Sequence, residues 1–378
     1  MDASAVLWER WRAQVKDLFG GMHGHQKKTL AMFVIGIVLS GSAVLQRVAE
    51  SISLHGMNPA KMTSTERRLA RFIANDRVVV TKIWDHFLSE VLPFWQGKPI
   101  RFILDCTPLR DDATMVYLGL LVHSRVLPVA WAVMPAQEKW EEAQWSIVAR
   151  LLDQIIPHLE GADCTLIADR GLAGFPLVKI CCDRKWHYLL RVSKEHTCQR
   201  KMGKGCSSWC RFDAFVQKTG QQWYGWAKVW RDDTIETYVS ACWQPEFKEG
   251  WLLISDQKAG KRRVKEYALR MRVESTFQDS KSRGWKLEAS LVKEEARLDR
   301  LLLALFLAMW WVSHLAASCM HHGKRDRFDR TDRRDKGIFR LGRLWLLDIL
   351  RRTCNQADLV HCLPFRQLAT GWRFALRF

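Results

Sequence analysis

The segment VKEYALRMRVESTFQDSK, residues 264–281, has the residue pattern of an amphipathic helix. When successive residues are turned by about 100°, four polar side chains fall within an arc of roughly 60°: Tyr267, Arg270, Glu274 and Lys281. The stripe beside them is apolar and consists of Leu269, Val273 and Phe277. The pattern predicts an anchored helix that presents one carboxylate among basic and aromatic groups. A merely solvated charged face would look the same, so the rest of the chain has to distinguish the two interpretations.

The composition predicts a globular protein with a polyanionic partner. The chain has 378 residues, of which 48% are hydrophobic, so two or three domains are expected and global disorder is excluded. Its 59 basic and 40 acidic residues give a formal charge of +19. We expect nucleic acid as the partner, ahead of an acidic membrane surface; a merely basic soluble protein is the alternative.

The 11 cysteines are scattered and odd in number, and no secretory signal precedes them, which predicts reduced thiols in the cytoplasm. Four residues, His196, Cys198, Cys206 and Cys210, cluster loosely. Their spacing is not that of a standard zinc site, so unliganded thiols are favoured over a structural metal.

Two apolar runs, residues 29–45 and 301–317, resemble membrane spans in composition. Each has about 17 residues, the lower limit for crossing a bilayer. The first contains Gly and Ser residues, and the second leads directly into a charged segment. Both are therefore predicted to be buried helices of a globular protein.

Residues 1–95 predict a helical N-terminal domain. The segment TERRLARFIAN, residues 65–75, is a basic helix within it. With Arg67, Arg68, Arg71 and Arg77, this module is basic enough to bind DNA, although an exposed basic helix without a specific role fits equally well.

After a linker near Pro93–Pro99 the hydrophobic period changes to that of strands. Short apolar runs predict strands at residues 100–105, 115–123, 127–134, 164–169 and 186–193, and helices at residues 141–158 and 175–184. Three successive strands, then helix, strand, helix and strand, predict an α/β fold with a mixed sheet flanked by helices, the layout of a ribonuclease-H-like core.

The remaining segments complete the predicted organisation. Residues 194–250 are rich in Gly, Trp, Thr and Cys and predict a β-rich insertion before Glu274. Residues 251–256 predict a strand that returns to the core, and a long helix is expected up to about Met320. Residues 321–352 mix basic and acidic side chains, which fits a DNA-contacting loop or a self-neutralising solvated stretch equally well. The predicted domain boundaries are 1–95, 96–193, 194–250, 251–320 and a basic C-terminal region, 321–378.

Three carboxylates are expected to meet in the core. Asp105 and Asp169 each close a predicted strand, and Glu274 lies on the helix beyond the insertion. Acids at the ends of adjacent strands converge at one edge of a sheet, and three of them require a compensating cation. Oxygen ligands suit two Mg²⁺ ions, for which Mn²⁺ can substitute, and such a pair catalyses displacement at phosphorus.

The spacing Y-(2)-R-(3)-E-(6)-K, met by Tyr267, Arg270, Glu274 and Lys281, resembles the YREK signature of the bacterial insertion-sequence-4 family of DDE transposases. LDCTP around Asp105 and ADRG around Asp169 resemble the segments that carry that family's aspartates. The resemblance covers roughly residues 27–320 and implies that the three acids hold the metals. It also implies that Tyr267, Arg270 and Lys281 bind DNA phosphates, and that a hairpin intermediate can form with a flipped base stacked on an aromatic residue. The stacking candidates are Trp223, Trp226, Trp230 and Trp251.

These observations together predict a cut-and-paste transposase that acts on double-stranded DNA. We expect it to bind terminal inverted repeats as a homodimer, to cleave them with Mg²⁺, and to join the 3′-ends to target DNA. The expected location is the bacterial cytoplasm in association with the nucleoid. A two-metal nuclease without strand transfer, or a domesticated DNA-binding protein that does not cut, is the alternative.

Overall fold

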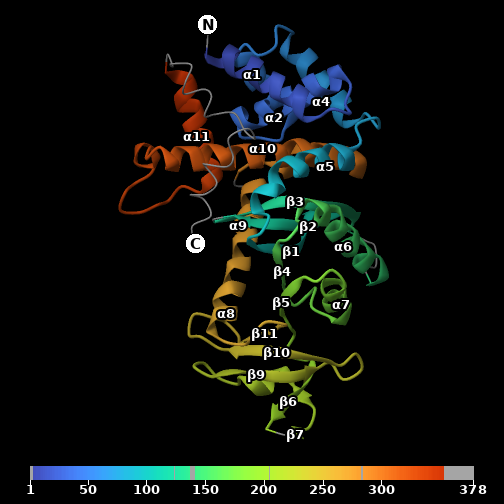
Figure 1. Cartoon of the computed structure of the whole chain (residues 1–378). Coiled ribbons are helices and arrows are strands. Elements are labelled where there is room, and N and C mark those ends of the chain that lie inside the picture. The colour runs from blue at the N-terminus through green and yellow to red at the C-terminus, as the bar shows by residue number, and fades with distance from the viewer. Residues whose placement is uncertain (1–2, 123, 137–140, 204, 282–283, 353–378) are drawn as a thin grey trace.

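A computed structural model describes residues 3–122, 124–136, 141–203, 205–281 and 284–352 of the chain, with the side chains of residues 141–143 left aside. Helices from both ends of the sequence pack together at one end of the molecule, and a long twisted sheet extends from them to the other end (Figure 1). One contiguous hydrophobic core runs through the helical part and the sheet.

The central part of the sheet has the strand order β3-β2-β1-β4-β5. Its strands are β1 (Pro99–Arg110), β2 (Ala113–Val122), β3 (Arg125–Pro135), β4 (Asp163–Ala168) and β5 (His187–Arg191). The first three form an antiparallel meander, whereas β1, β4 and β5 are parallel. The helices α6 (Glu141–Ile155) and α7 (Phe175–Asp183) supply the crossovers that parallel strands require. The predicted ribonuclease-H-like mixed sheet flanked by helices is thereby confirmed.

The predicted β-rich insertion does not form a sheet of its own. Its strands are β6 (Thr197–Met202), β7 (Gly205–Cys206), β8 (Cys210–Arg211), β9 (Gln222–Val229) and β10 (Ile235–Cys242). Strand β11 (Trp251–Ser255) pairs antiparallel with both β5 and β10, so the insertion continues the core sheet beyond β5. Within the described residues the result is one 11-stranded sheet.

The helical end is built around α10 (Glu295–His321), which lies between the N-terminal helices and β3 (Figure 1). The N-terminal helices are α1 (Ala3–Leu18), α2 (Gly24–Ser40), α3 (Leu45–Leu54), α4 (Met62–Ile73) and α5 (Val80–Val91). The buried helix predicted from residues 29–45 ends early, at Ser40, because the chain turns by 90° between α2 and α3. Gly41 makes this turn with a φ of +64°, a value that favours glycine.

Among the described residues, α10 is the one single helix with the length and apolarity of a membrane span. Its apolar window is completely buried by other parts of the protein, as expected for the core helix predicted from residues 301–317. Tryptophan side chains on both sides of α10 take part in this packing; Trp310, for example, donates its Nε1 hydrogen to the Pro128 carbonyl at 2.8 Å.

The C-terminal region contributes a helix that was not predicted, α11 (Ile338–Arg351), which packs against α10. The two backbones cross closely. A Cβ atom added at Gly342 would lie only 1.9 Å from the Val312 carbonyl oxygen, so only glycine fits at this crossing. In residues 324–336 several arginines form ion pairs with nearby aspartates, such as Arg330 with Asp332 at 2.6 Å, which agrees with the self-neutralising alternative. Residues 353–378 of the predicted basic region lie outside the described residues.

Candidate active site

The register of two parallel strands brings Asp105 and Asp169 side by side. The pairing of β1 with β4 runs up to Leu104 opposite Ala168, and the two aspartates are the next residues on each strand. Asp169 follows the end of β4, as predicted, but Asp105 is not at the end of its strand. Strand β1 continues to Arg110 paired with β2 alone, so Asp105 lies where the sheet edge opens.

The segment that carries Glu274 is helical over nearly its whole predicted length. It consists of α8 (Lys261–Ala268), a short 3₁₀ turn (Leu269–Met271) and α9 (Arg272–Ser280). Val273 and Phe277 are buried and Leu269 is half-buried, so the apolar stripe anchors the segment as expected. The 3₁₀ turn tightens the backbone at Arg270, whose side chain is directed into the protein and is only 10% exposed.

Arg270 joins all three predicted carboxylates. Its Nη2 atom lies 2.8 Å from Asp105 Oδ2 and 3.5 Å from Asp169 Oδ2, and its Nη1 atom lies 3.2 Å from Glu274 Oε1. The two aspartates and the glutamate come from segments that are far apart in sequence. The structure therefore brings the predicted triad together around one guanidinium group.

The environments of the three carboxylates differ. Burial raises the pKa of Asp105 above its usual range, and the charges of Arg270 and the Cys106 N–H offset this effect only in part. Asp169 is also partly desolvated, but Arg270, the Arg170 N–H and the Tyr267 hydroxyl hold its pKa below the usual range. The Glu274 side chain is 49% exposed. One acid is thus buried, one is strongly hydrogen-bonded, and one is open to solvent.

The predicted phosphate-binding residues divide into two groups. Tyr267 is buried, and its hydroxyl donates to Asp169 Oδ1 at 2.9 Å, so it lies within the acid cluster together with Arg270. Lys281 instead contacts β1 beyond Asp105, where its amine donates to Thr107 Oγ1 at 2.9 Å and to the Pro108 carbonyl. Burial lowers the pKa of this amine.

Further residues of the site were missed by the sequence analysis. Asp105 and Asp169 line a cleft of about 380 Å³ whose other walls include Thr114 of β2 and Gln144 of α6. Behind Asp169, Arg191 lies 3.8 Å from the carboxylate and 2.6 Å from Glu249. No motif marks these residues, because their proximity depends on strand pairing.

The donor set fits hard divalent cations. All three acids supply oxygen ligands, and burial keeps the pKa of Asp105 raised despite the charge of Arg270 beside it. Among the described residues, no three His, Cys, Asp or Glu side chains already stand at metal-binding separations. The Arg270 guanidinium lies between the three acids and supplies the positive charge that they contact in this structure.

Comparison with known protein families agrees with this geometry. Residues 141–311 match the family model of the transposase DDE domain. The matched segment contains Asp169 and Glu274 and begins after Asp105. The match supports a DDE transposase. No curated protein matches the chain. The insertion-sequence-4 type and the YREK signature remain predictions.

The four tryptophans predicted as candidates for base stacking lie in different surroundings. Trp251 stacks on Phe247 at 3.9 Å and meets Tyr267 edge-on at 5.1 Å, which connects it to the acid cluster. The other three contact residues of the insertion: Trp223 packs on Phe215, Trp226 on Tyr238, and Trp230 donates to His196 Nδ1.

The loose cysteine cluster lies in the β-rich insertion. Cys198 and Cys210 face each other on β6 and β8 with their Sγ atoms 3.8 Å apart, and both are free thiols. Cys206 is exposed, and His196 is engaged with Trp230. In the described part of the chain the four residues therefore do not converge on one point.

Proposed function

We propose that the protein is the transposase of a bacterial insertion sequence of the insertion-sequence-4 type, and that Asp105, Asp169 and Glu274 form its catalytic centre. The observation that supports this most directly is the convergence of the three acids on Arg270 at the edge of a ribonuclease-H-like sheet. The match to the transposase DDE domain supports the transposase assignment independently of this geometry.

The three carboxylates would hold two Mg²⁺ ions, for which Mn²⁺ can substitute. Bound ions of this kind activate an attacking oxygen and stabilise the leaving oxygen at phosphorus. When no metal ions are bound, Arg270 keeps the three acids close together. Once it is released from the acids, its planar guanidinium binds a DNA phosphate. Tyr267 positions Asp169 through its hydroxyl, and Lys281 holds a phosphate farther along β1.

DNA is expected to contact more than the acid cluster. On α4 the side chains of Arg67, Arg68 and Arg71 are exposed, and Arg77 follows shortly after the helix. This face supports a role for residues 1–95 in binding the terminal repeats, with 96–193 and 251–320 as the catalytic core, 194–250 as the insertion and 321–378 as a basic C-terminal region. The protein would act in the cytoplasm at the nucleoid, as a homodimer that pairs two transposon ends.

Cleavage of DNA that flanks the gene separates this proposal from its alternatives. The wild type is incubated with a labelled duplex containing the predicted transposon end, Mg²⁺ and a target plasmid, and the products are resolved on a denaturing gel. The proposal predicts a cut at the transposon end, a hairpin intermediate and joined products. Cleavage without joining would indicate a nuclease, and binding without cleavage in Mg²⁺ or Mn²⁺ would indicate a DNA-binding protein that does not cut.

A further inference from the structure

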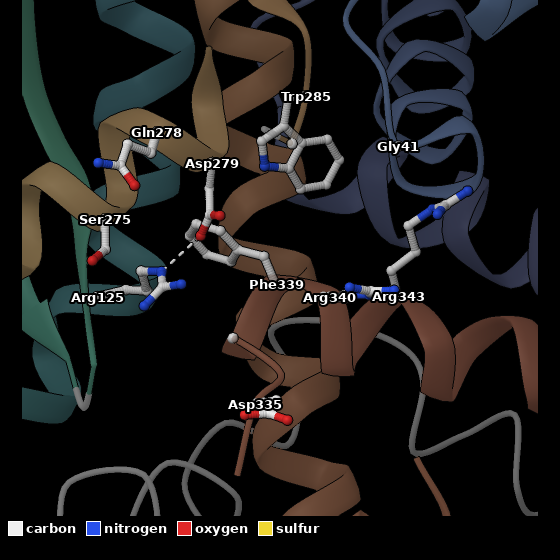
Figure 2. Close-up of a pocket in the computed structure, with 12 residues that line it drawn as sticks. Gly41, Arg125, Ser275, Gln278, Asp279, Trp285, Asp335, Phe339, Arg340 and Arg343 are labelled. Carbon is white, nitrogen blue, oxygen red and sulfur yellow. Dashed lines mark hydrogen bonds and ion pairs between the residues drawn. The ribbon is translucent and has the colours of Figure 1, made fainter. Parts of the chain in front are cut away.

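A second cavity, which unlike the first has arginines in its wall, lies beside the helix α9 that carries Glu274. It has a volume of about 450 Å³ and is lined by Ser275, Gln278 and Asp279 of α9, together with the first turns of α11 and the start of β3 (Figure 2). Ser275 is the residue next to Glu274, and Gln278 lies one helical turn beyond it. The cavity is therefore adjacent to the proposed active centre but is lined by different residues from the cleft that contains Asp105 and Asp169.

Positive charge remains uncompensated in this cavity. Arg125 and Asp279 neutralise each other through an ion pair of 2.7 Å, visible as the dashed line in Figure 2, and Asp335 pairs with Arg333 at 2.7 Å. Two other guanidinium groups that line the cavity, those of Arg340 and Arg343, have no carboxylate partner among the described residues.

The two arginines are held differently. Arg343 donates to the carbonyl oxygens of Val38 and Leu39 at the end of α2, with the shorter contact at 2.8 Å, which fixes its side chain. Arg340 is exposed in the first turn of α11, and no protein group is seen to bind it in the described part of the chain. The cavity therefore offers one fixed and one adaptable guanidinium group to an anion.

The other walls determine which anion fits. Trp285 and Phe339 are both buried and pack edge-on at 6.4 Å, so they form a rigid, largely apolar wall. A cavity of this volume is much larger than an isolated phosphate needs and falls in the range of small-ligand sites. Guanidinium groups match the oxygen geometry of phosphate, and an apolar wall accommodates the sugar attached to it.

We propose that this cavity binds one nucleotide of the DNA strand that passes the active centre, with its phosphate held by Arg340 and Arg343. The site rests on the proposed function, because it requires DNA at the acid cluster. Because Ser275 and Gln278 lie within about one helical turn of Glu274, the bound nucleotide lies close to the cleaved bond along the strand. The catalytic helix is thereby contacted by the strand at two neighbouring points.

The test measures DNA affinity as a function of salt and of backbone charge. Fluorescence anisotropy gives the Kd of a transposon-end duplex for the wild type, Arg340→Ala and Gln278→Glu. The second variant adds a carboxylate to the cavity without removing a basic residue. Arg330→Ala is the matched control, because Arg330 is also an exposed arginine near the start of α11, is paired with Asp332, and does not line the cavity. A series of duplexes, each with one uncharged methylphosphonate near the cleaved bond, locates the phosphate.

The proposal predicts that Arg340→Ala weakens binding by about 5- to 10-fold and lowers the salt slope by about 1, the contribution of one phosphate contact. Gln278→Glu also weakens binding, and the Kd of Arg330→Ala stays within about twofold of the wild-type value. One methylphosphonate position weakens the wild type but has no further effect on Arg340→Ala.

Equal affinities for Arg340→Ala, Gln278→Glu and the control would overturn the site while leaving the proposed function intact. The site would also be overturned if each methylphosphonate weakened DNA binding by Arg340→Ala as much as it weakens binding by the wild type. A wild type that binds no duplex would overturn the proposed function, and this site with it.

Discussion

Replacing Arg270 with glutamine should destabilise the metal-free protein, because three acids lose their common counter-ion. Arg270 and Asp105 are only 10% and 13% exposed, so the change leaves a buried carboxylate without a partner, which typically costs about 3–5 kcal/mol. Glu274 is half-exposed and adds little. The raised pKa of Asp105 allows this acid to take up a proton, which limits the cost. We therefore expect the lower end of the range, about 3 kcal/mol.

For a chain of 378 residues that unfolds in one step, an unfolding entropy near 2.1 cal/mol/K per residue converts this loss into a decrease in Tm of roughly 4 °C. Urea denaturation in EDTA measures the free energy of unfolding, and Lys265→Gln, an exposed residue of α8, is the matched control. Adding Asp105→Asn to Arg270→Gln should recover part of the loss, since the buried charge is then absent. The reasoning is refuted if Arg270→Gln is as stable in EDTA as Lys265→Gln.

Three further predictions concern the framework around the site. Burial raises the pKa of Asp299, whose Oδ1 accepts from Trp131 Nε1 at 2.6 Å, so its stabilising contribution is complete below its unfolded-state pKa and is lost as the pH rises through the folded-state pKa. Asp299→Asn should therefore raise the Tm at pH 7, with a gain of roughly 1 kcal/mol in the free energy of unfolding, and the gain should be much smaller at pH 3, below the usual pKa of an aspartate. A gain of equal size at both pH values would contradict this. Arg300 is buried and donates to two carbonyl oxygens, one at the end of α4 and one just before α5. Arg300→Ala should therefore lower the free energy of unfolding measured in urea by about 1–3 kcal/mol. An unchanged midpoint would count against these hydrogen bonds. Gly342→Ala should lower the free energy of unfolding by about 1–3 kcal/mol or more, because the added Cβ would overlap the Val312 carbonyl oxygen. A variant as stable as the wild type in urea would show that α11 does not cross α10 so closely.

Local patterns were sufficient to predict the elements of the catalytic core. Apolar runs gave the strands of the central sheet to within a few residues, because strands buried on both faces consist almost entirely of apolar side chains. The segment around Glu274 was predicted from its helical period, and its apolar stripe is buried as expected. These features depend only on neighbouring residues.

Features that depend on long-range pairing were not predictable from local sequence. Residues 251–256 were correctly predicted to be a strand that returns to the core, but nothing in residues 194–250 indicates that this strand pairs with both β5 and β10 and so makes the insertion continue the core sheet. The contact of Arg191 with Asp169 and Glu249 arises from the same pairing. The sequence does not predict α11, because its apolar residues follow a strongly charged stretch that makes residues 321–352 as a whole resemble a solvated loop.

The position of Arg270 is the most informative difference between sequence and structure. The sequence predicts that it lies on the same face as Glu274 and binds a phosphate. In the protein it contacts both aspartates as well, since the 3₁₀ turn directs it toward the end of the β1–β4 pairing. The proposed phosphate contact of Arg270 and its observed contacts with the acids are alternatives for one side chain, so the proposal connects the state of the acid cluster to DNA binding.

The most direct test of the account compares cleavage of one transposon-end duplex by the wild type and by Asp105→Asn, Asp169→Asn and Glu274→Gln in Mg²⁺. Each variant keeps the size of its side chain and removes one negative charge, and anisotropy measures DNA binding in parallel. Every variant should still bind the duplex, whereas its cleavage rate should fall by a factor on the order of 1,000 or more, as expected when a group that supports the transition-state charge is lost. Wild-type cleavage by any one of the three would show that the carboxylates around Arg270 are not the catalytic centre.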